Sequence, residues 1–333
     1  MNAILNWGVD FIAGLQNSAP WLGAPSQFFS FLGTEKFYLF LLTFLYWCVD
    51  VRLGLRVGVI LSVSDCLNAF LKLLFHQPRP YWVSDKVRVI KAEVSYGLPS
   101  GHAQHAVTVW GTVAAWGKGW LRWLMATLIF LIGLSRIALA VHFPTDVLAG
   151  WFIGGVILWA FLKWEAPVIA WFNLLTLFQK IGVAFAASVL LILISFAGLA
   201  FVPSVDPSHW KADFARAFSL ALDQAAIRLR ATTGAVGVGG TFFGLVAGAI
   251  LIFQRGGFDA RGTWPKRALR FIVGMIGVII LWLGLTTVFP RDASLISQVL
   301  RYVRYALIGF WVSYTAPLIF VKLGLQNTSK VPG

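Results

Sequence analysis

Residues 180–202 read KIGVAFAASVLLILISFAGLAFV, a stretch in which Lys180 carries the only charge. About 20 mostly apolar residues are enough for a helix to cross the hydrocarbon core of a bilayer. From Val189 to Phe201 the residues are apolar on every face, whereas a strand of a transmembrane barrel alternates apolar and polar residues. The stretch therefore predicts a membrane-spanning helix.

The composition extends this prediction to the whole chain. Hydrophobic residues make up 59% of the 333 positions, charged residues 12%, and the mean hydropathy is +0.78. A soluble domain has about 45–50% apolar and about 25% charged residues. We expect an all-α integral membrane protein with a six-helix core and about three additional C-terminal transmembrane helices. The predicted spans are 37–50, 54–75, 103–117, 121–141, 146–164, 180–202, 235–254, 268–289 and 302–323.

The formal net charge of +14 does not indicate a nucleic-acid partner, because the basic residues lie singly in loops between apolar runs. With nine spans, the two sides of the membrane hold similar numbers of basic residues. Most acidic residues lie on one side, and the short basic loop 255–270 lies on the other. The positive-inside rule then places loop 255–270 in the cytoplasm of a plasma (inner) membrane, and the loops 76–98 and 203–233 on the extracytoplasmic side.

The N-terminal segment differs from the spans. Residues 1–30 lack a charged region followed by a clean apolar core, so they do not resemble a signal peptide. Trp7, Phe11 and Leu15 recur at helical spacing, as in an amphipathic helix that lies in the membrane interface. The predicted regions are an interfacial segment 1–34, a transmembrane core 35–202, an extramembrane loop 203–234 and additional spans 235–333.

Three groups of polar residues lie at the ends of predicted spans, where ionisable side chains are costly unless they have partners or functions. They are Lys72 to Pro80 (KLLFHQPRP, ending in Arg79-Pro80), Pro99-Ser100-Gly101-His102, and Ser135-Arg136 followed by His142 and Asp146. Their candidate site residues are three cations (Lys72, Arg79 and Arg136), a hydroxyl (Ser100), two histidines (His102 and His142) and a carboxylate (Asp146). This set suits a phosphoryl group, since arginine and lysine stabilise its oxygens without a metal ion or other cofactor.

The second group is placed to begin a helix. Ser100 is a good N-cap residue, and Gly101 leaves the backbone accessible. Free amides at the start of the third span, together with the helix dipole, could therefore bind an anion.

The third group provides a nucleophile. Pro144 fits the first position of a helix, which places His142 just before the helix and Asp146 in its first turn. A carboxylate that holds one imidazole nitrogen leaves the other basic, so His142 is the predicted nucleophile. His102, with an ordinary pKa of about 6.5, is the predicted acid for the leaving group and the base for water.

The three groups match the signature Lys-x6-Arg-Pro, Pro-Ser-Gly-His and Ser-Arg-x5-His-x3-Asp at every defining position. In this respect the chain resembles the type 2 phosphatidic acid phosphatase superfamily over roughly residues 35–200. Glucose-6-phosphatase and the vanadium haloperoxidases are related to that superfamily. The resemblance implies phosphate binding by Lys72, Arg79, Ser100, Gly101 and Arg136, with His102 as general acid, His142 as nucleophile and Asp146 as its orienting partner.

These observations predict a metal-independent membrane phosphatase that hydrolyses lipid phosphate monoesters or pyrophosphates through a phosphohistidine, with the bilayer and a lipid phosphate as its partners. Candidate substrates are phosphatidic acid, phosphatidylglycerol phosphate and undecaprenyl pyrophosphate. The alternatives are a glucose-6-phosphatase-like enzyme, a lipid phosphotransferase and a non-enzymatic lipid or anion transporter. A metal cluster of His102, His105, His142 and Asp146 is a weaker hypothesis, because three cationic side chains lie beside it.

Other distinctive residues have structural interpretations. Glycines at 240, 244 and 248 form a small-xxx-small ridge, for which packing within the bundle is favoured over a homodimer face. The two cysteines, Cys48 and Cys66, lack metal-ligand or redox spacing and are predicted to be buried packing thiols. The histidines outside the motifs are predicted to be loop or packing residues, namely His76, His105 and His209.

Overall fold

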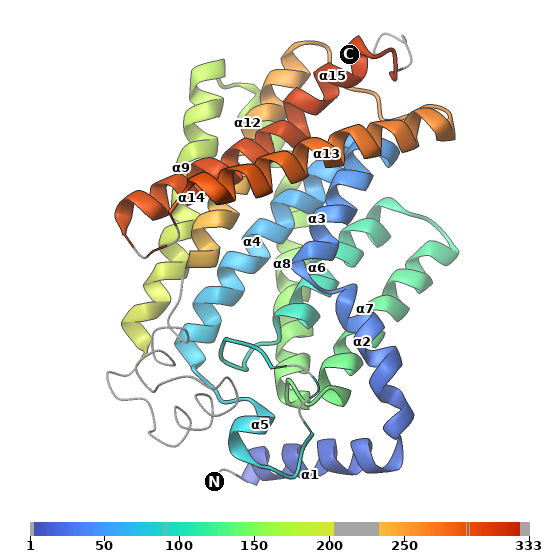
Figure 1. The fold of residues 1–333 in the computed structure, drawn as a ribbon, viewed down its shortest axis with the longest axis vertical. Helices are drawn as coiled ribbons and strands as arrows, with labels where there is room; N and C mark the ends of the chain where they lie inside the picture. Colours follow the sequence, from blue (N-terminus) through green and yellow to red (C-terminus); the bar gives the residue numbers. More distant parts are fainter. Residues whose placement is uncertain are drawn as a thin grey trace. The chain divides into compact units, whose positions relative to one another are not determined.

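The computed structural model describes residues 3–88, 90, 92–202, 233–290, 292 and 294–326. Within these ranges the chain is helical and contains no β-strand (Figure 1). The all-α class predicted from the apolar runs is therefore confirmed. The predicted extramembrane loop 203–234 and His209 lie almost wholly outside the described residues.

Seven described helices are long and apolar enough to cross a membrane, or eight if one bent pair counts as a single span. Nine spans were predicted. The predicted span 103–117 is α6 (Gly101–Trp116), which has only 16 residues and is buried along most of its length. The predicted span 37–50 is α3 (Glu35–Phe44) with the π-helical segment η2 (Leu45–Val49), and it qualifies only together with Pro20–Phe31.

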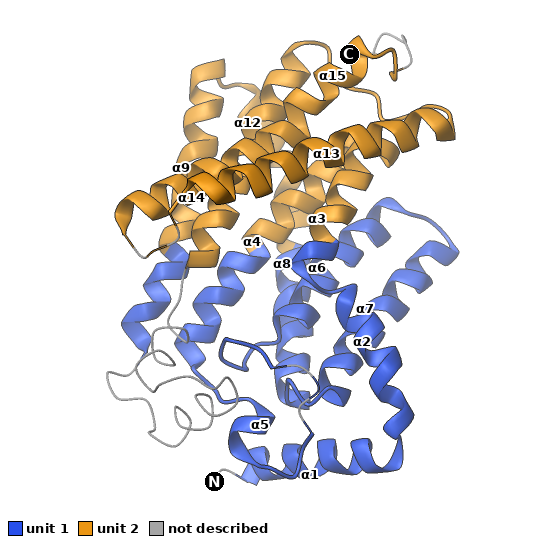
Figure 2. Ribbon diagram, in the orientation of Figure 1, with its two compact units in different colours: residues 1–37, 64–159, 194–232 blue, residues 38–63, 160–193, 233–333 orange. Residues whose placement is uncertain are grey.

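The chain forms two compact units (Figure 2). Unit 1 comprises Met1–Phe37, Ser64–Trp159 and Ile194–Thr232, and unit 2 comprises Tyr38–Val63, Ala160–Leu193 and Thr233–Gly333. Four of the boundaries fall inside helices, which therefore contribute residues to both units: α3, α4 (Val51–Phe75), α8 (Pro144–Asn173) and α9 (Leu177–Ala197).

Unit 1 contains α1 (Ala3–Ser18), the short η1 (Pro20–Leu22), α2 (Gly23–Phe31), α5 (Pro80–Val83), α6 and α7 (Trp120–Ala138). Helix α6 packs against α7, α2 packs on α7, and α1 lies beside α5 (Figure 1). The apolar core of this unit joins Val9 and Ile12 of α1 to Tyr96, Val141 and Phe143. The N-terminal helix therefore supports the loop that carries His142.

Two of the helix starts in unit 1 follow from local sequence. Ser100 is the N-cap of α6, and its Oγ accepts a hydrogen bond from the Ala103 amide at 3.4 Å. Pro144 begins α8 and places Asp146 in the first turn. Both predicted helix starts are confirmed.

Unit 2 contains α12 (Thr233–Gln254), α13 (Trp264–Val288), α14 (Leu295–Phe310), η4 (Trp311–Thr315) and α15 (Ala316–Lys322). Helices α12 and α14 approach closely because the glycine ridge lies between them. A Cβ atom at Gly240 or Gly244 would collide with the carbonyl oxygen of Tyr302 or Ala306. The ridge therefore packs within the chain, as the sequence favoured, and this face does not remain open for a homodimer.

Aromatic side chains add polar anchors to unit 2. The Trp47 indole nitrogen donates to the Val312 carbonyl at 2.8 Å, and the Tyr46 hydroxyl donates to the Ser313 carbonyl at 3.1 Å.

Cys48 and Cys66 are both buried free thiols, which confirms their predicted packing role.

Candidate active site

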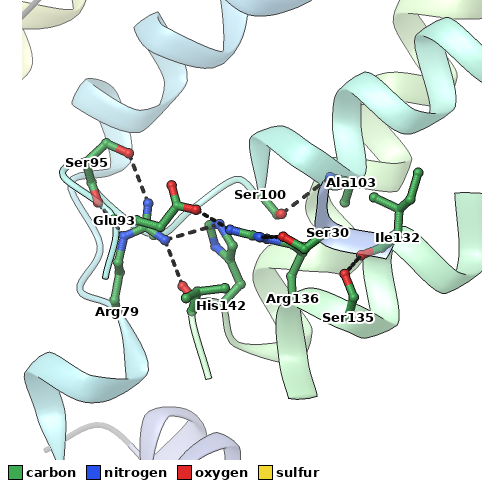
Figure 3. A network of polar contacts seen from close by, with 12 residues as sticks. Ser30, Arg79, Glu93, Ser95, Ser100, Ala103, Ile132, Ser135, Arg136 and His142 are labelled. Atoms are coloured by element: carbon green, nitrogen blue, oxygen red, sulfur yellow. Dashed lines mark hydrogen bonds and ion pairs between the residues drawn. The ribbon is translucent and has the colours of Figure 1, made fainter. Parts of the chain in front are cut away.

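All the motif residues belong to unit 1 and come from the ends of helices. Figure 3 shows four of them, Arg79, Ser100, Arg136 and His142. Each lies where a helix ends or begins: Lys72 in the last turns of α4, Arg79 before α5, Ser100, Gly101 and His102 at the start of α6, Arg136 at the end of α7, His142 before α8 and Asp146 in its first turn. Helix ends leave backbone groups without intrahelical partners, so this is a region where polar side chains can be accommodated.

His142 and Asp146 form a buried pair. The imidazole Nδ1 lies 3.2 Å from Asp146 Oδ2, which also accepts a hydrogen bond from the Phe143 amide at 3.0 Å. Since the carboxylate can only accept, Nδ1 carries the proton and Nε2 keeps its lone pair. The predicted arrangement of these two residues is present in the structure.

The environment of His142 keeps the imidazole neutral. Burial lowers its pKa well below the ordinary value, and the positive charges of Arg79 and Lys72 lower it further. A neutral imidazole with an unprotonated Nε2 is the nucleophilic form.

Arg79 is fixed beside this nitrogen. Its Nη1 lies 3.3 Å from His142 Nε2 and donates to the Val141 carbonyl at 2.8 Å. Its Nε donates to the Ser95 carbonyl at 2.5 Å, and Nη2 donates to Ser95 Oγ at 3.0 Å. The guanidinium is therefore buried and oriented before any substrate binds.

Lys72 reaches the same segment of chain. Its Nζ donates to the carbonyl oxygens of Tyr96 and Gly97 at 2.6 and 3.3 Å. Gly97 was not singled out from the sequence, yet a Cβ there would lie 2.6 Å from the Pro78 carbonyl oxygen and 3.1 Å from Asp146 Oδ2. A side chain at this position would displace the backbone at Pro78 or the Asp146 carboxylate.

Arg136 is fully buried, and two residues outside the motifs hold it. Its Nη2 forms an ion pair with Glu93 Oε1 at 2.5 Å, and its Nη1 donates to the Ser30 hydroxyl. Burial alone would raise the pKa of Glu93, but the charges of Arg136 and Arg79 hold it below the ordinary value. The carboxylate is therefore ionised at neutral pH.

The start of α6 is tied to the start of α8, because the Ser100 amide donates to the Asp146 carbonyl at 2.9 Å. His102 follows in the first turn and packs against Gly33, where a Cβ would lie 2.8 Å from its Cδ2. His102 is close enough to His142 and Glu93 for its charge to lower the pKa of both groups.

His105 belongs to a second polar network. Its Nδ1 lies 2.9 Å from Ser64 Oγ, and its Nε2 lies 3.2 Å from Asp65 Oδ1. The side-chain oxygen of the neighbouring Gln104 accepts a hydrogen bond from the side-chain amide of Asn68 at 2.9 Å. His105 is therefore a satisfied packing residue, as predicted, and these partners separate it from the alternative metal cluster.

The predicted site residues are connected partly by direct contacts and partly through a shared loop segment. Arg79 and Asp146 each contact His142 directly, while Lys72 and Arg136 join them through the segment 93–97. These residues form a buried imidazole–carboxylate pair bordered by three cationic side chains, in a chain whose helices include membrane-spanning ones, and such features define a class of integral membrane protein with a buried cationic site.

Comparison with known families identifies that class. Residues 53–170, which contain every motif residue, match the model of the PAP2 superfamily. Residues 236–328 match the transmembrane extension of PAP2 superfamily phosphatases. The two matches together cover most of the chain, which belongs to the PAP2 superfamily and is an integral membrane protein.

Individual proteins of known name are similar to this chain over only part of its length. Glucose-6-phosphatase 3 of Bos taurus is 29% identical over 185 residues, which are 48% of this chain and 53% of that protein. Phosphatidylglycerophosphatase B of Bacillus subtilis is 27% identical over 149 residues, which are 40% of this chain and 71% of that protein. The crystal structure of Aquifex aeolicus LpxE covers 46% of this chain and 93% of its own, at 27% identity and a TM-score of 0.43. The chain spans about half the length of the first curated relatives that it matches.

Proposed function

We propose that this protein is a metal-independent phosphatase that hydrolyses lipid phosphate monoesters or pyrophosphates through a phosphohistidine on His142. The observation that carries the proposal is the environment of His142. Asp146 holds Nδ1 at 3.2 Å, and the neutral Nε2 lies 3.3 Å from the Arg79 guanidinium. A nucleophile and a phosphate-binding cation are thus adjacent in one buried site.

In the first step, Nε2 of His142 attacks the phosphorus and the bond to the leaving oxygen breaks. His102 donates a proton to that oxygen. Arg79 and Lys72 stabilise the charge on the equatorial oxygens, together with Arg136. The amides at the start of α6, after Ser100 and Gly101, add the positive end of a helix dipole.

In the second step, water attacks the phosphohistidine. His102, now deprotonated, accepts the proton of the water, the N–P bond breaks, and the electron pair returns to Nε2 of His142. Asp146 keeps Nδ1 protonated throughout and stabilises the positive charge on the imidazole. Three side-chain cations fill the role that a divalent ion plays in other phosphoryl-transfer enzymes.

The surface of α1 favours a lipid substrate. One side of this helix packs on unit 1, through Gly8, Val9, Ile12 and Gln16. The next side exposes Ile4, Trp7 and Phe11, and the remaining side exposes Asn6, Asp10 and Asn17. A helix with one docked, one apolar and one polar face is suited to the membrane interface, as the sequence predicted for residues 1–34.

This interfacial helix lies close to the site, since Gly8 packs against Phe143, the neighbour of His142. Lipid headgroups at the interface would therefore be near the nucleophile. If all nine predicted spans cross the membrane, the charge asymmetry between the loops favours the extracytoplasmic side for the site. The names of the relatives include both a lipid and a sugar phosphatase, so glucose 6-phosphate is the second candidate substrate.

The decisive experiment measures phosphate release by the purified protein in excess chelator. The panel comprises phosphatidic acid, phosphatidylglycerol phosphate, undecaprenyl pyrophosphate and glucose 6-phosphate. We expect release from a lipid substrate by the wild type and none by His142→Ala, with His76→Ala as the matched control outside the site. Full activity of His142→Ala, or activity that requires a metal, contradicts the mechanism, whereas a preference for glucose 6-phosphate contradicts only the substrate.

A further inference from the structure

An acidic side chain lies inside the cationic site. Glu93 Oε1 pairs with Nη2 of Arg136, and Ser30 accepts a hydrogen bond from Nη1 (Figure 3). Both terminal nitrogens of this guanidinium therefore have protein partners. The proposed function requires the same guanidinium to bind a phosphoryl oxygen. The Glu93 carboxylate and the substrate phosphate therefore compete for Arg136.

The two partners differ in freedom to move. The Arg136 side chain is 0% exposed, whereas the Glu93 side chain is 23% exposed. The backbone of Glu93 is fixed by Tyr81, whose hydroxyl accepts from the Glu93 amide at 3.0 Å and donates to its carbonyl at 3.1 Å. Exchange with an incoming anion therefore requires only rotation of the glutamate side chain, which has staggered alternatives.

The charges oppose simultaneous binding. The Glu93 carboxylate is ionised at neutral pH, as argued above from its position between Arg136 and Arg79. A phosphate monoester carries a charge of about −1.5 to −2 at pH 7. Two such anions on one guanidinium repel each other strongly, because the site is buried and weakly screened.

We propose that the Glu93 carboxylate is an internal competitor for the phosphoryl group. It occupies Arg136 in the resting site, leaves when the substrate binds, and returns to expel the product phosphate. This inference rests on the proposed function and adds to it a residue that sets the affinity of the site for phosphate.

A purely structural role makes the opposite prediction. If Glu93 only holds Arg136 in place, its removal disorders the guanidinium and weakens phosphate binding. If Glu93 competes, its removal frees the guanidinium and strengthens phosphate binding. Damage to the fold cannot produce tighter binding, so the direction of the change separates the two roles.

The test uses the purified full-length protein and inorganic phosphate as the probe. Calorimetric titration without substrate compares the wild type with Glu93→Gln, which has nearly the same shape but no charge, and with Glu93→Ala. We expect phosphate to bind about tenfold more tightly to both variants, the size expected for removing a competing charged hydrogen bond. Asp10→Asn is the matched control, because it removes one negative charge at an exposed pair with Lys86 in the same unit.

The outcomes separate this inference from the proposed function. Unchanged or weaker phosphate binding by variants that still unfold cooperatively overturns the competition. Hydrolysis by the wild type together with that result leaves the phosphatase proposal intact. Tighter phosphate binding by the variants, in a protein that hydrolyses no member of the substrate panel, supports the competition and overturns the phosphatase proposal.

Discussion

The helix ends of unit 1 and the helix pair α12 and α14 of unit 2 are held together by different means. In unit 1, the buried side chains of Arg79, Arg136 and Asp146 form hydrogen bonds or ion pairs with loop residues. In unit 2, Gly240 and Gly244 let two backbones touch with few polar contacts. The first arrangement orients reactive groups, while the second only requires close packing. Substitutions in the two regions should therefore affect different properties.

The largest effect is expected for Asp146→Asn. Asparagine preserves the size of the side chain but can donate to Nδ1, which favours the wrong imidazole tautomer and removes the stabilising charge. Loss of the orienting carboxylate of a catalytic histidine lowers turnover by about 10⁴-fold. We expect such a loss of phosphate release with only a small change in the unfolding temperature, measured on the same detergent-solubilised sample. A variant that keeps more than a tenth of the activity would show that His142 does not need this carboxylate.

The pH dependence of the attack by His142 on phosphorus tests whether its imidazole is neutral. The pKa of His142 is lowered by burial and by the nearby cations, so the neutral nucleophile persists below the ordinary histidine pKa of about 6.5. Single-turnover phosphorylation of His142 should therefore not decrease as the pH is lowered from 7.5 to 6.5, and should decrease only under more acidic conditions.

Removing a nearby cation should move that acidic limb. Lys72→Met eliminates one of the charges that lower the pKa of His142, so the limb should shift to higher pH. The same linkage affects folding, because the unfolded chain binds a proton on this histidine below pH 6.5 and the folded chain does not. The contribution of His142 to stability is therefore lost as the pH falls. An acidic limb centred at or above pH 6.5 in the wild type would contradict the buried neutral imidazole.

The contrasting substitution is Gly244→Leu in α12. The added side chain would collide with the backbone of α14 at Ala306, and overpacking of this kind costs about 1–3 kcal/mol. We expect a lower unfolding temperature but normal activity per folded molecule. Gly284→Leu in α13 is the matched control, since nothing lies within 4 Å of a Cβ at that position. Equal destabilisation by the two variants would show that the close approach of α12 and α14 is not important for stability.

The parts of the site that the sequence predicted are those in which partners lie close in the chain. His142 and Asp146 are four residues apart, and Pro144 fixes the helix start between them, so their pairing follows from local geometry. Ser100 is three residues from the amide that it caps. Spacing along a helix is enough to infer such contacts.

The contacts that the sequence missed are long-range. Glu93 is 43 residues from Arg136, and Ser30 is 106 residues away. Both contacts depend on how the segment 92–98 and α2 pack, and neither leaves a periodic signal. An unassigned acidic residue in a polar stretch with several cations was the only available indication of Glu93.

Each of the nine predicted spans falls on a described helix, but only seven or eight of the described helices are long and apolar enough to cross a membrane. Hydropathy measures whether residues are apolar, and it does not distinguish lipid from protein as their surroundings. Helix α6 is apolar because other helices of unit 1 surround it, and its 16 residues are short for a complete crossing of the bilayer. Polar residues within it, including Gln104 and Thr108, are fully buried in the protein. The predicted boundary at residue 103 was nevertheless within two residues of the observed helix start.

The smallest expected effect concerns α1. This helix packs on the rest of unit 1, like the helices that carry the site residues, but it also exposes an apolar face, like a membrane-bound helix. Trp7 and Phe11 stack on that face, with ring centroids 5.7 Å apart. We expect the double variant Trp7→Ala, Phe11→Ala to lower activity a few-fold on a lipid phosphate in vesicles, because the helix no longer holds the interface near the site. Activity on a short-chain, water-soluble analogue should be unchanged, since neither residue contacts the site.

The matched control for that variant is Asn6→Ala, Asn17→Ala on the polar face of the same helix, which leaves the apolar face intact. Comparing the two substrates in the two variants separates membrane attachment from support of the catalytic loop. If the aromatic variant loses activity equally on both substrates, α1 acts through Phe143 and the His142 loop. If only the vesicle substrate is affected, the exposed apolar face of α1 is a lipid-binding surface, and α1 both packs beside the site and binds the membrane.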